Sequence, residues 1–173
     1  MTSELLAPAP DLQADQLFLG IDHLAIAVPD LNEAIRWFHG TLGFTVDERR
    51  ETSGLRTGMK SAVLSNGPVT LVLTQGLGKQ SQTSQYVDKH GPGVQHVAFR
   101  VADLDEAVQQ LRAQGMEFST PLLEGEDLSQ IFSVRHPASG MMVELIERRN
   151  GYTGFHDGNV QRLFDALEKQ ELY

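Results

Sequence analysis

This 173-residue chain contains the stretch GIDHLAIAVPDLNEAI at residues 20–35 and repeats it as GVQHVAFRVADLDEAV at residues 93–108. The two copies align without a gap at an offset of 73 residues, and eight of the sixteen positions are identical. Each copy opens with an apolar run, which predicts a buried strand, and continues with apolar residues at helical spacing. Two copies of one supersecondary unit can pack about a pseudo-twofold axis, which brings equivalent residues face to face.

The start of a helix is marked in the same way in both copies. Asp30 is followed by Glu33, and Asp103 by Glu106, which is the spacing of a capping box with Asp in place of Ser or Thr. Apolar side chains then recur every three or four residues until Gly43 ends the first helix. Each copy therefore predicts a strand followed by an amphipathic helix.

Three further strands are predicted in each module, which makes each module βαβββ. The α+β fold predicted from this order joins the two modules into a strongly curved eight-stranded sheet around a metal cleft, with the helices outside. A short helix is expected in the linker at residues 85–90. The modules span residues 17–76 and 93–148, with further strands at 44–49, 60–65 and 69–74 in the first and at 117–119, 129–136 and 141–147 in the second.

The two ends of the chain differ from the modules. Residues 1–16 contain two prolines and little periodicity, and we expect a mobile tail ahead of a single domain at 17–173. Residues 159–171 place Val160, Leu163 and Leu167 on one face of a helix, which needs an apolar surface to dock on.

Composition excludes several classes of function. The net charge is −9 with a pI of about 5.0, which disfavours nucleic acid and anionic membranes because phosphate binding needs clustered Lys and Arg. The chain has no cysteine, so disulfides and thiolate metal sites are absent. It shows no signal peptide and no apolar run of about 18 residues, so we expect a cytoplasmic protein that acts on a small molecule.

A metal site is predicted where the repeats meet. His23 and His96 occupy the same position of the two copies and would converge across the pseudo-twofold axis. A lone histidine is more often a hydrogen-bonded core residue, but two at equivalent positions favour a metal. Glu144 is the third candidate, because a carboxylate on a buried strand is costly unless it is paired or bound to metal. The other four histidines lie near a helix end or in expected loops: His39, His90, His136 and His156.

The number of ligands separates two chemistries. The repeat places Leu71 or Thr70 opposite Glu144, and neither is a good ligand. Two imidazoles and one carboxylate match the facial triad of non-haem Fe(II) oxygenases, which leaves positions open for substrate and dioxygen. A fourth protein ligand, for which only Gln75 can be proposed, would favour Lewis-acid chemistry without oxygen.

The motifs HLAIAVPD at residues 23–30 and HP…VEL at residues 136–145, with the βαβββ repeat, resemble the vicinal oxygen chelate superfamily. This resemblance covers nearly all of the chain after the tail and implies the fold of that superfamily. The superfamily includes glyoxalases, methylmalonyl-CoA epimerases, extradiol dioxygenases and metal-free antibiotic-binding proteins. Membership alone therefore does not fix the reaction.

Other segments resemble the C-terminal catalytic half of the 4-hydroxyphenylpyruvate dioxygenases: SAVL at 61–64, GPGVQHVA at 91–98, SQIF at 129–132 and the tail from 147 to 159. The resemblance implies that His23, His96 and Glu144 bind Fe(II), that dioxygen is a co-substrate, and that the last helix closes over the site. The family's substrate is a 2-oxo acid that chelates iron through its carboxylate and keto oxygens. The positions that match the family's substrate pocket are Ser61, Gln75, Gln82, Gln130, Phe132, Phe155 and Val160.

The chain departs from that family in two ways. It is too short for the family's additional N-terminal domain, so we expect it to stand alone or to form a homodimer. Val160 stands where the family has a phenylalanine that packs on the aromatic substrate. We therefore expect a different, smaller or aliphatic 2-oxo acid rather than 4-hydroxyphenylpyruvate.

The function predicted from these observations is a non-haem Fe(II)-dependent dioxygenase or hydroxylase. It would oxidatively decarboxylate a 2-oxo acid and oxidise the remainder of the same molecule. Two alternatives stay open: a metal-dependent epimerase or glyoxalase-type lyase, and a resistance protein that sequesters a small molecule in the cleft.

Overall fold

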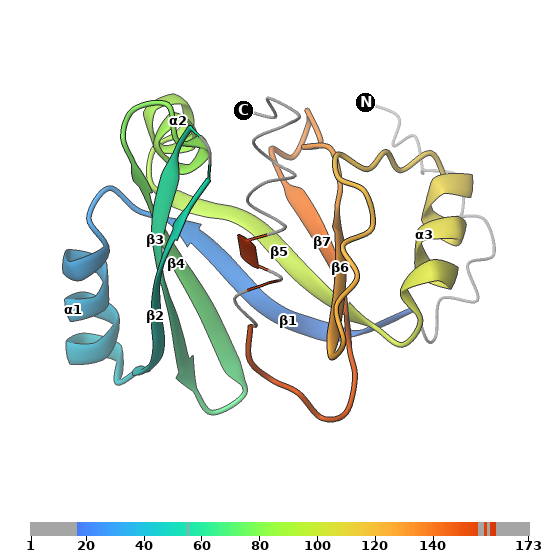
Figure 1. Ribbon diagram of the computed structural model, residues 1–173, viewed down its shortest axis with the longest axis horizontal. Coiled ribbons are helices and arrows are strands. Elements are labelled where there is room, and N and C mark those ends of the chain that lie inside the picture. Colours follow the sequence, from blue (N-terminus) through green and yellow to red (C-terminus); the bar gives the residue numbers. More distant parts are fainter. Residues whose placement is uncertain (1–16, 55, 156–157, 159, 162–173) are drawn as a thin grey trace, which may run out of the picture.

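The computed structural model describes residues 17–54, 56–155, 158 and 160–161, and within them the strands form one curved sheet (Figure 1). The strand order is β2-β3-β4-β1-β5-β7-β6. The elements, in chain order, are β1 (Phe18–Ala27), α1 (Leu31–Leu42), β2 (Thr45–Ser53), β3 (Gly58–Asn66), β4 (Val69–Leu77), α2 (Gln82–His90), β5 (Gly93–Val101), α3 (Leu104–Ala113), β6 (Leu128–Phe132) and β7 (Met142–Arg148).

The predicted pseudo-twofold axis passes between β1 and β5, the first strands of the two modules. These strands pair antiparallel, with His23 opposite Ala98 and Ala25 opposite His96. Each then pairs parallel with the last strand of its own module, β1 with β4 and β5 with β7. The repeat thus folds into two halves of one sheet, and α1 and α3 lie on its outer side at opposite ends (Figure 1).

The described part of the sheet has seven strands, so the prediction of eight is wrong. The segment predicted as a strand at residues 117–119 makes a single bridge, between Phe118 and Ser133. The side-chain hydroxyl of Thr120 accepts the Phe132 N–H at 3.0 Å, which takes the donor that the next rung of a ladder would use. Pro121 follows and has no N–H to donate. A short polar segment that ends in proline therefore stops pairing after one residue pair.

Helices α1 and α3 begin where the capping boxes predict. The Glu33 N–H donates to Asp30 Oδ1 at 2.8 Å, and the Glu106 N–H donates to Asp103 Oδ1 at 2.9 Å. Gly43 ends α1 with a φ of 71°, in the left-handed region that glycine adopts without strain.

Helices α1 and α3 each have a second cap, which is a side-chain acceptor on a strand of the sheet. The Leu31 N–H at the start of α1 donates to Gln75 Oε1 on β4 at 2.8 Å. The Leu104 N–H at the start of α3 donates to Glu147 Oε2 on β7 at 3.0 Å. The two caps occupy equivalent places in the two modules, and each ties a helix start to the last strand of its module.

The two helices bury separate cores against the outer side of the sheet. Leu31 and Ile35 of α1 pack with Leu64, Leu71 and Leu73. In the second half, Leu104, Ala107 and Val108 of α3 pack with Ile131 and Leu145. Because strand side chains alternate between faces, the residues between these core positions point to the concave side. The concave face is thus left free for a site.

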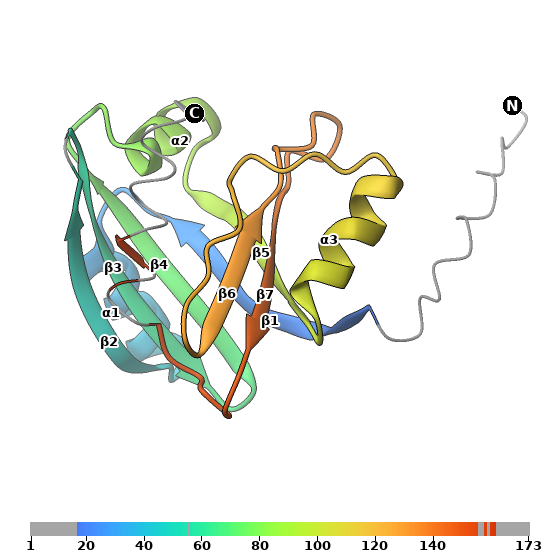
Figure 2. The same cartoon turned by 45° about the vertical axis from the view of Figure 1, so that its right-hand side comes forward.

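The chain after β7 returns across the concave side toward β2 (Figure 2). Gln161 Nε2 donates to the carbonyl oxygen of Ser53 at the end of β2, at 3.0 Å. The predicted tail at residues 1–16 lies outside the described residues, as does the predicted helix at 159–171 apart from residues 160 and 161, which are helical. Among the described residues, no helix combines the length and the hydropathy that crossing a bilayer requires.

Close packing of α2 on β4 yields a test of this fold. A Cβ added at Gly76 would lie 2.6 Å from Ser81 Oγ and 2.7 Å from the Ser84 backbone nitrogen, and would also meet Ser84 Oγ. We expect Gly76→Ala to lower the free energy of unfolding by about 1–3 kcal/mol, since the helix start must move. The control is Gly40→Ala within α1, where nothing lies within 4 Å and helix propensity predicts a gain of up to about 1 kcal/mol. Thermal unfolding measures both, and equal effects would contradict the packing.

Candidate metal centre and its cavity

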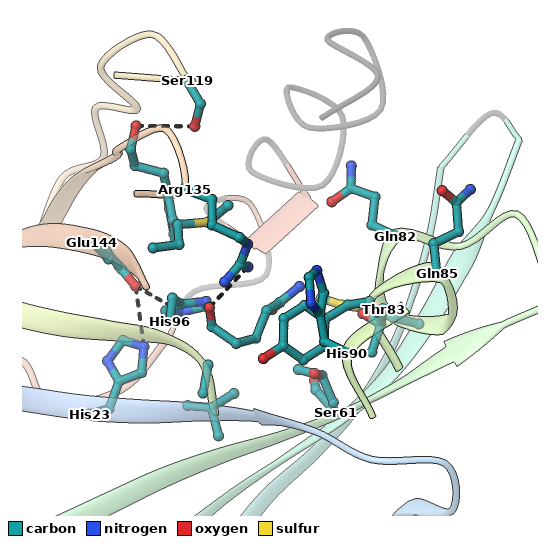
Figure 3. A pocket seen from close by; sticks show the side chains of 18 of the residues that line it. His23, Ser61, Gln82, Thr83, Gln85, His90, His96, Ser119, Arg135 and Glu144 are labelled. Carbon is teal, nitrogen blue, oxygen red and sulfur yellow. Dashed lines mark hydrogen bonds and ion pairs between the residues drawn. The ribbon is translucent and has the colours of Figure 1, made fainter. Parts of the chain in front are cut away.

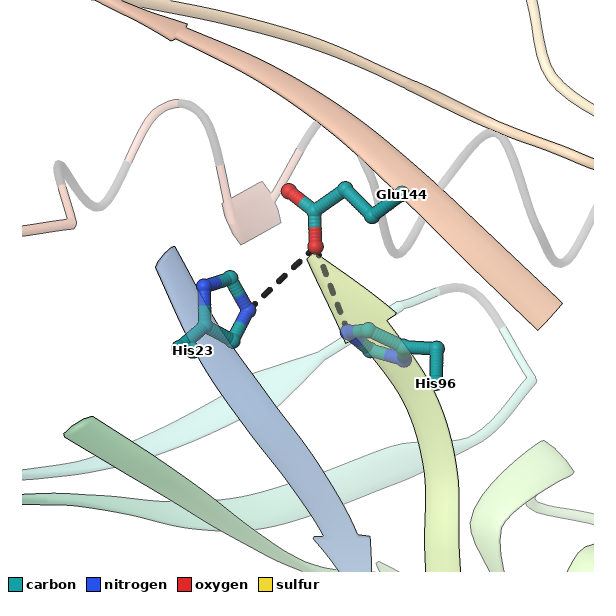
Figure 4. Close-up of side chains that lie close together, drawn as sticks. All are labelled: His23, His96 and Glu144. Carbon is teal, nitrogen blue, oxygen red and sulfur yellow. Dashed lines mark ion pairs between the residues drawn. The ribbon is translucent and has the colours of Figure 1, made fainter. Parts of the chain in front are cut away.

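His23, His96 and Glu144 come together on the concave face, from the adjacent strands β1, β5 and β7 (Figure 4). Ala98 lies between them as the sheet partner of both His23 and Glu144, so three neighbouring strands point one side chain each at the same place. His23 Nε2 lies 3.3 Å and His96 Nε2 3.2 Å from Glu144 Oε2. His23 is 3% and Glu144 1% exposed, so the cluster is at the bottom of the cleft.

The chemistry and spacing of this triad fit one divalent metal ion. Ligand atoms bonded to a common ion at about 2.1 Å lie about 3.0–3.4 Å apart at octahedral to tetrahedral angles, which matches the distances to Glu144 Oε2. Glu144 Oε1 is buried and has no hydrogen-bond partner among the described residues. A buried carboxylate oxygen without a donor is costly, and a cation would relieve that cost.

Asp22 orients His23 from the side away from Glu144. Its Oδ1 lies 3.0 Å from His23 Nδ1, which places the Nδ1 proton in this hydrogen bond and directs Nε2 toward the triad. Arg148 binds both oxygens of Asp22 at 2.8 Å, and Arg100 binds Oδ2 at 2.8 and 3.0 Å. Burial opposes ionisation, but Arg148, His23 and Arg100 hold the pKa of Asp22 well below its usual range. Asp22 is therefore a permanent acceptor.

In the metal-free triad, a proton on His23 offsets the negative charge of Glu144. Burial disfavours a charged His23, but Glu144 and Asp22 outweigh burial and raise the pKa of His23 to about 9. Burial also opposes ionisation of Glu144, yet His23 and His96 lower its pKa to about 2. Burial lowers the pKa of His96. At neutral pH the metal-free site is thus a carboxylate, one neutral imidazole and one imidazolium, and a metal ion would replace the proton on His23.

The first module contributes no carboxylate to the site. Ala25 pairs with Val72 just as Ala98 pairs with Glu144, so Val72 is the structural counterpart of Glu144. The sequence repeat had placed Leu71 or Thr70 there, which is one or two residues off. Valine has no ligand atom, and within the described residues the metal cluster has three members.

Gln75 lies on the other face of the sheet, contrary to the prediction that it contacts substrate or serves as a fourth ligand. Its neighbour Thr74 lines the cleft, and alternation therefore directs Gln75 to the outer side, where it caps α1. Its counterpart Glu147 does the same for α3. The family resemblance places a polar side chain near this point of the strand but does not determine which face it occupies.

A cavity of about 910 Å³ opens from the triad toward α2 (Figure 3). Gln130 on β6 is 4% exposed and lines the cavity from the strand next to that of Glu144, whereas Ser61 on β3 and Gln82 on α2 line the far wall. Gln82 Nε2 is a buried donor without a partner among the described residues. Apart from Gln75, all the residues predicted for the substrate pocket border this one space: Ser61, Gln82, Gln130, Phe132, Phe155 and Val160.

Two aromatic rings pack edge-on against the histidines of the triad. Phe132 meets His96 edge-on at 5.2 Å between centroids, and Phe155 meets His23 in the same way at 5.1 Å. Phe155 is held by two arginines: the Arg148 guanidinium lies 4.9 Å from its ring centroid, and Arg50 Nη2 donates to its carbonyl oxygen at 2.6 Å. The segment after β7 is therefore fastened above His23 from both sides of the cleft.

Several functional residues escaped the sequence analysis. Asp22 and Arg148 are near neighbours of predicted residues, but only the folded chain shows that they meet. Arg135 and Tyr86 line the cavity wall, and the sequence predicted no role for either of them. One signal was available: Asp22 precedes His23 in the first copy, where the second copy has Gln95 before His96.

Paired modules that direct two histidines and a glutamate into one cleft define a metal-binding class of protein. The chain belongs to the glyoxalase/bleomycin resistance protein/dioxygenase superfamily, whose family model matches residues 22–132. This confirms the superfamily-level resemblance that the motifs indicated.

Relatives of known sequence and structure include several kinds of enzyme. The chain is 29% identical to an uncharacterised Synechocystis protein and 29% identical to 4-hydroxyphenylpyruvate dioxygenase of Yarrowia lipolytica, in each case over 87% of its length. It spans 57% and 50% of the lengths of these relatives. A triple mutant of Streptomyces coelicolor 4-hydroxymandelate synthase superposes with a TM-score of 0.76 at 24% identity, covering 87% of this chain and 54% of that one. Methylmalonyl-CoA epimerase from Mycobacterium tuberculosis gives 0.65 at 33% identity, covering 78% and 91%.

The proton held by His23 predicts how metal binding depends on pH. Between about pH 6.5 and 9 the metal must displace one proton, so its apparent affinity should rise about tenfold per pH unit and level off above about pH 9. Calorimetry of Co(II) binding in buffers of different ionisation enthalpy measures the protons released, and we expect about one per ion near pH 7.5. Glu144→Gln is the control, because it keeps the shape of the side chain but should lose most of the affinity. Binding without proton release would exclude His23 as a ligand.

The contact between Asp22 and His23 predicts a loss of affinity without loss of a ligand. Asp22→Asn should weaken Co(II) binding about 10- to 100-fold, since the orienting carboxylate is removed while all three ligands remain. Arg100→Gln is the matched control: it removes one partner of Asp22 and leaves the contact with His23 in place. If the two variants bind Co(II) equally well, Asp22 does not act through His23.

Proposed function

We propose that this protein is a non-haem Fe(II)-dependent dioxygenase or hydroxylase that oxidatively decarboxylates a 2-oxo acid and oxidises the same molecule. The observation that carries the proposal is the three-ligand set, with Val72 where symmetry would place a fourth ligand. An octahedral ion held by three protein ligands keeps three positions for other molecules. Bound Fe(II) in such a site supplies dioxygen activation and holds a chelating 2-oxo acid.

The similarity to 4-hydroxyphenylpyruvate dioxygenase supports the same chemistry. It extends over 87% of this chain, whereas the methylmalonyl-CoA epimerase structure covers 78% of it. The substrate of this chain is a separate matter. Val160 lines the cavity with a small side chain, so we propose a 2-oxo acid other than 4-hydroxyphenylpyruvate.

The cavity residues have distinct tasks in this proposal. Gln130, Ser61 and Gln82 offer hydrogen-bonding groups to polar atoms of the substrate. Gln82 Nε2, which has no partner among the described residues, gains an acceptor when substrate binds. Phe132 and Phe155 pack against the two histidines and limit the access of water to the metal. Arg50 and Arg148 keep Phe155 in place.

A second candidate is a metal-dependent epimerase or glyoxalase-type lyase. The specific observation in its favour is the 33% identity to methylmalonyl-CoA epimerase, of which the chain covers 91%. That reaction would use the same triad and consume no oxygen. A protein that only sequesters a small molecule is the weakest candidate, because it does not need a buried charged triad in which Glu144 Oε1 has no partner among the described residues.

The deciding experiment measures oxygen and carbon dioxide together. Protein loaded anaerobically with Fe(II) is mixed with each of a panel of aromatic and aliphatic 2-oxo acids in air-saturated buffer. We expect oxygen uptake and CO2 release in equal amounts with at least one acid, and a loss of at least about 100-fold in Glu144→Gln. Co(II)-loaded protein is the control for metal binding without oxygen chemistry.

Two outcomes would contradict the proposal. Tight Fe(II) binding with no oxygen uptake for any 2-oxo acid would remove the oxygenase, and solvent deuterium entering methylmalonyl-CoA would then support the epimerase. Oxygen uptake that is fastest with 4-hydroxyphenylpyruvate would keep the reaction class and overturn the substrate.

A further inference from the structure

Arg135 projects into the cavity on the side that faces α2 (Figure 3). It follows β6 and is half-buried. Its Nη1 donates to the Gly140 carbonyl oxygen at 2.6 Å and its Nη2 to the Gln95 carbonyl oxygen at 3.1 Å. Tyr86 covers one side, with its ring centroid 4.9 Å from the guanidinium carbon. The Tyr86 hydroxyl is itself fixed by donating to the Val94 carbonyl oxygen at 2.8 Å.

These contacts position the guanidinium without neutralising it. None of its partners carries a full negative charge, and no carboxylate of the described residues lies within ion-pair distance. Two of its five N–H groups are used by described residues, and these residues leave three without a partner. Arg50, the other arginine that lines the cavity, is paired with Glu48. Within the part of the chain that the structure describes, Arg135 is thus a fixed, half-buried charge that lacks a counter-ion.

The neighbouring charges do not supply one. Asp88 and Lys89 are exposed at the end of α2, and no ion pair joins Asp88 to Arg135; His90 and His136 are exposed at the same rim. The carboxylate of Glu144 is committed to the triad on the floor. Apart from Lys89 at the exposed rim, the described lining of the cavity therefore presents two separate positive points to a ligand, one at the metal site and one at Arg135.

We propose that Arg135 binds a second oxyanion of the substrate, so that the cavity takes a 2-oxo acid with a further carboxylate or phosphate group at its far end. This rests on the proposed function for the end of the molecule that chelates the metal. A planar guanidinium with free N–H groups recognises a carboxylate or phosphate in two-point contact, which a neutral substrate end cannot match. The arrangement selects a dianionic substrate and fits the absence of an aromatic ring at Val160.

The first test compares ligands that differ only in the distal charge. The probes are 2-oxoglutarate, 2-oxoadipate and their distal monomethyl esters, titrated calorimetrically and without oxygen into Co(II)-loaded protein. We expect at least one acid to bind at least tenfold more tightly than its ester. Arg135→Gln should reduce that ratio to about one in protein that is saturated with Co(II). Arg135→Lys keeps the charge and should restore part of the ratio.

The control variant is Arg112→Gln on α3, which removes a guanidinium that contacts Phe118 outside the cavity. It should bind all four probes like the parent protein. If Arg135→Gln weakens acids and esters equally, Arg135 only anchors the turn at Gly140 and the proposal is overturned. Equal binding of acid and ester to the parent protein overturns it as well.

A second test needs no keto group and therefore separates this inference from the proposed function. Phenylglyoxal modifies accessible arginines, and peptide mass spectrometry measures the rate at each site. We expect glutarate or inorganic phosphate to slow modification of Arg135 several-fold, with no effect of dimethyl glutarate and none at Arg112. Protection of Arg135 from modification, without binding of any 2-oxo acid, would support the anion site and contradict the proposed oxygenase function. Binding of 2-oxo acids without protection of Arg135, and without a preference for the acid over its ester, would contradict the anion site and leave the proposed oxygenase function in place.

Discussion

The antiparallel pairing of β1 with β5 is the contact on which the rest of the molecule depends. It joins the two modules at their first strands, so the two repeated histidines arrive on adjacent strands of one concave face. The parallel strands β4 and β7 then extend the sheet on both sides, and β7 brings Glu144 beside the histidines. Because α1 and α3 pack on the outer side, this central pairing leaves the triad open to a cavity rather than buried under a helix.

Much of this arrangement could be predicted because it rests on patterns of local sequence. The repeat located His23 and His96, and strand alternation put Glu144 on the concave face. Val72 could not be placed in this way, since the sequence offset between the modules is 73 at the first strands but 72 at the last ones. Gln75 was predicted from the family resemblance, which does not determine the face of the strand, and in the structure it caps α1. The failed strand at residues 117–119 has a similar origin, because its outcome depends on where the Thr120 hydroxyl finds a donor.

Arg148 connects the metal centre to the chain that covers it. It holds both oxygens of Asp22, which orients His23, and it also donates to the Gly154 carbonyl oxygen and lies over Phe155. The ligand geometry and the position of the covering segment thus share one side chain. A change in the covering segment would therefore alter the orientation of His23, and a change at Asp22 would alter the position of the covering segment, although the two are far apart in the sequence.

The caps at Gln75 and Glu147 have a consequence for how the sheet assembles. A parallel strand that slips by one residue exposes its core face, but a slip by two residues keeps every side chain on its proper face and escapes that penalty. Here such a slip would carry Gln75 or Glu147 about 7 Å along the strand and leave the first N–H of a helix without its acceptor. The caps thus stabilise one register of each parallel strand. They hold β4 and β7 at the one alignment that sets Val72 and Glu144 beside the histidines.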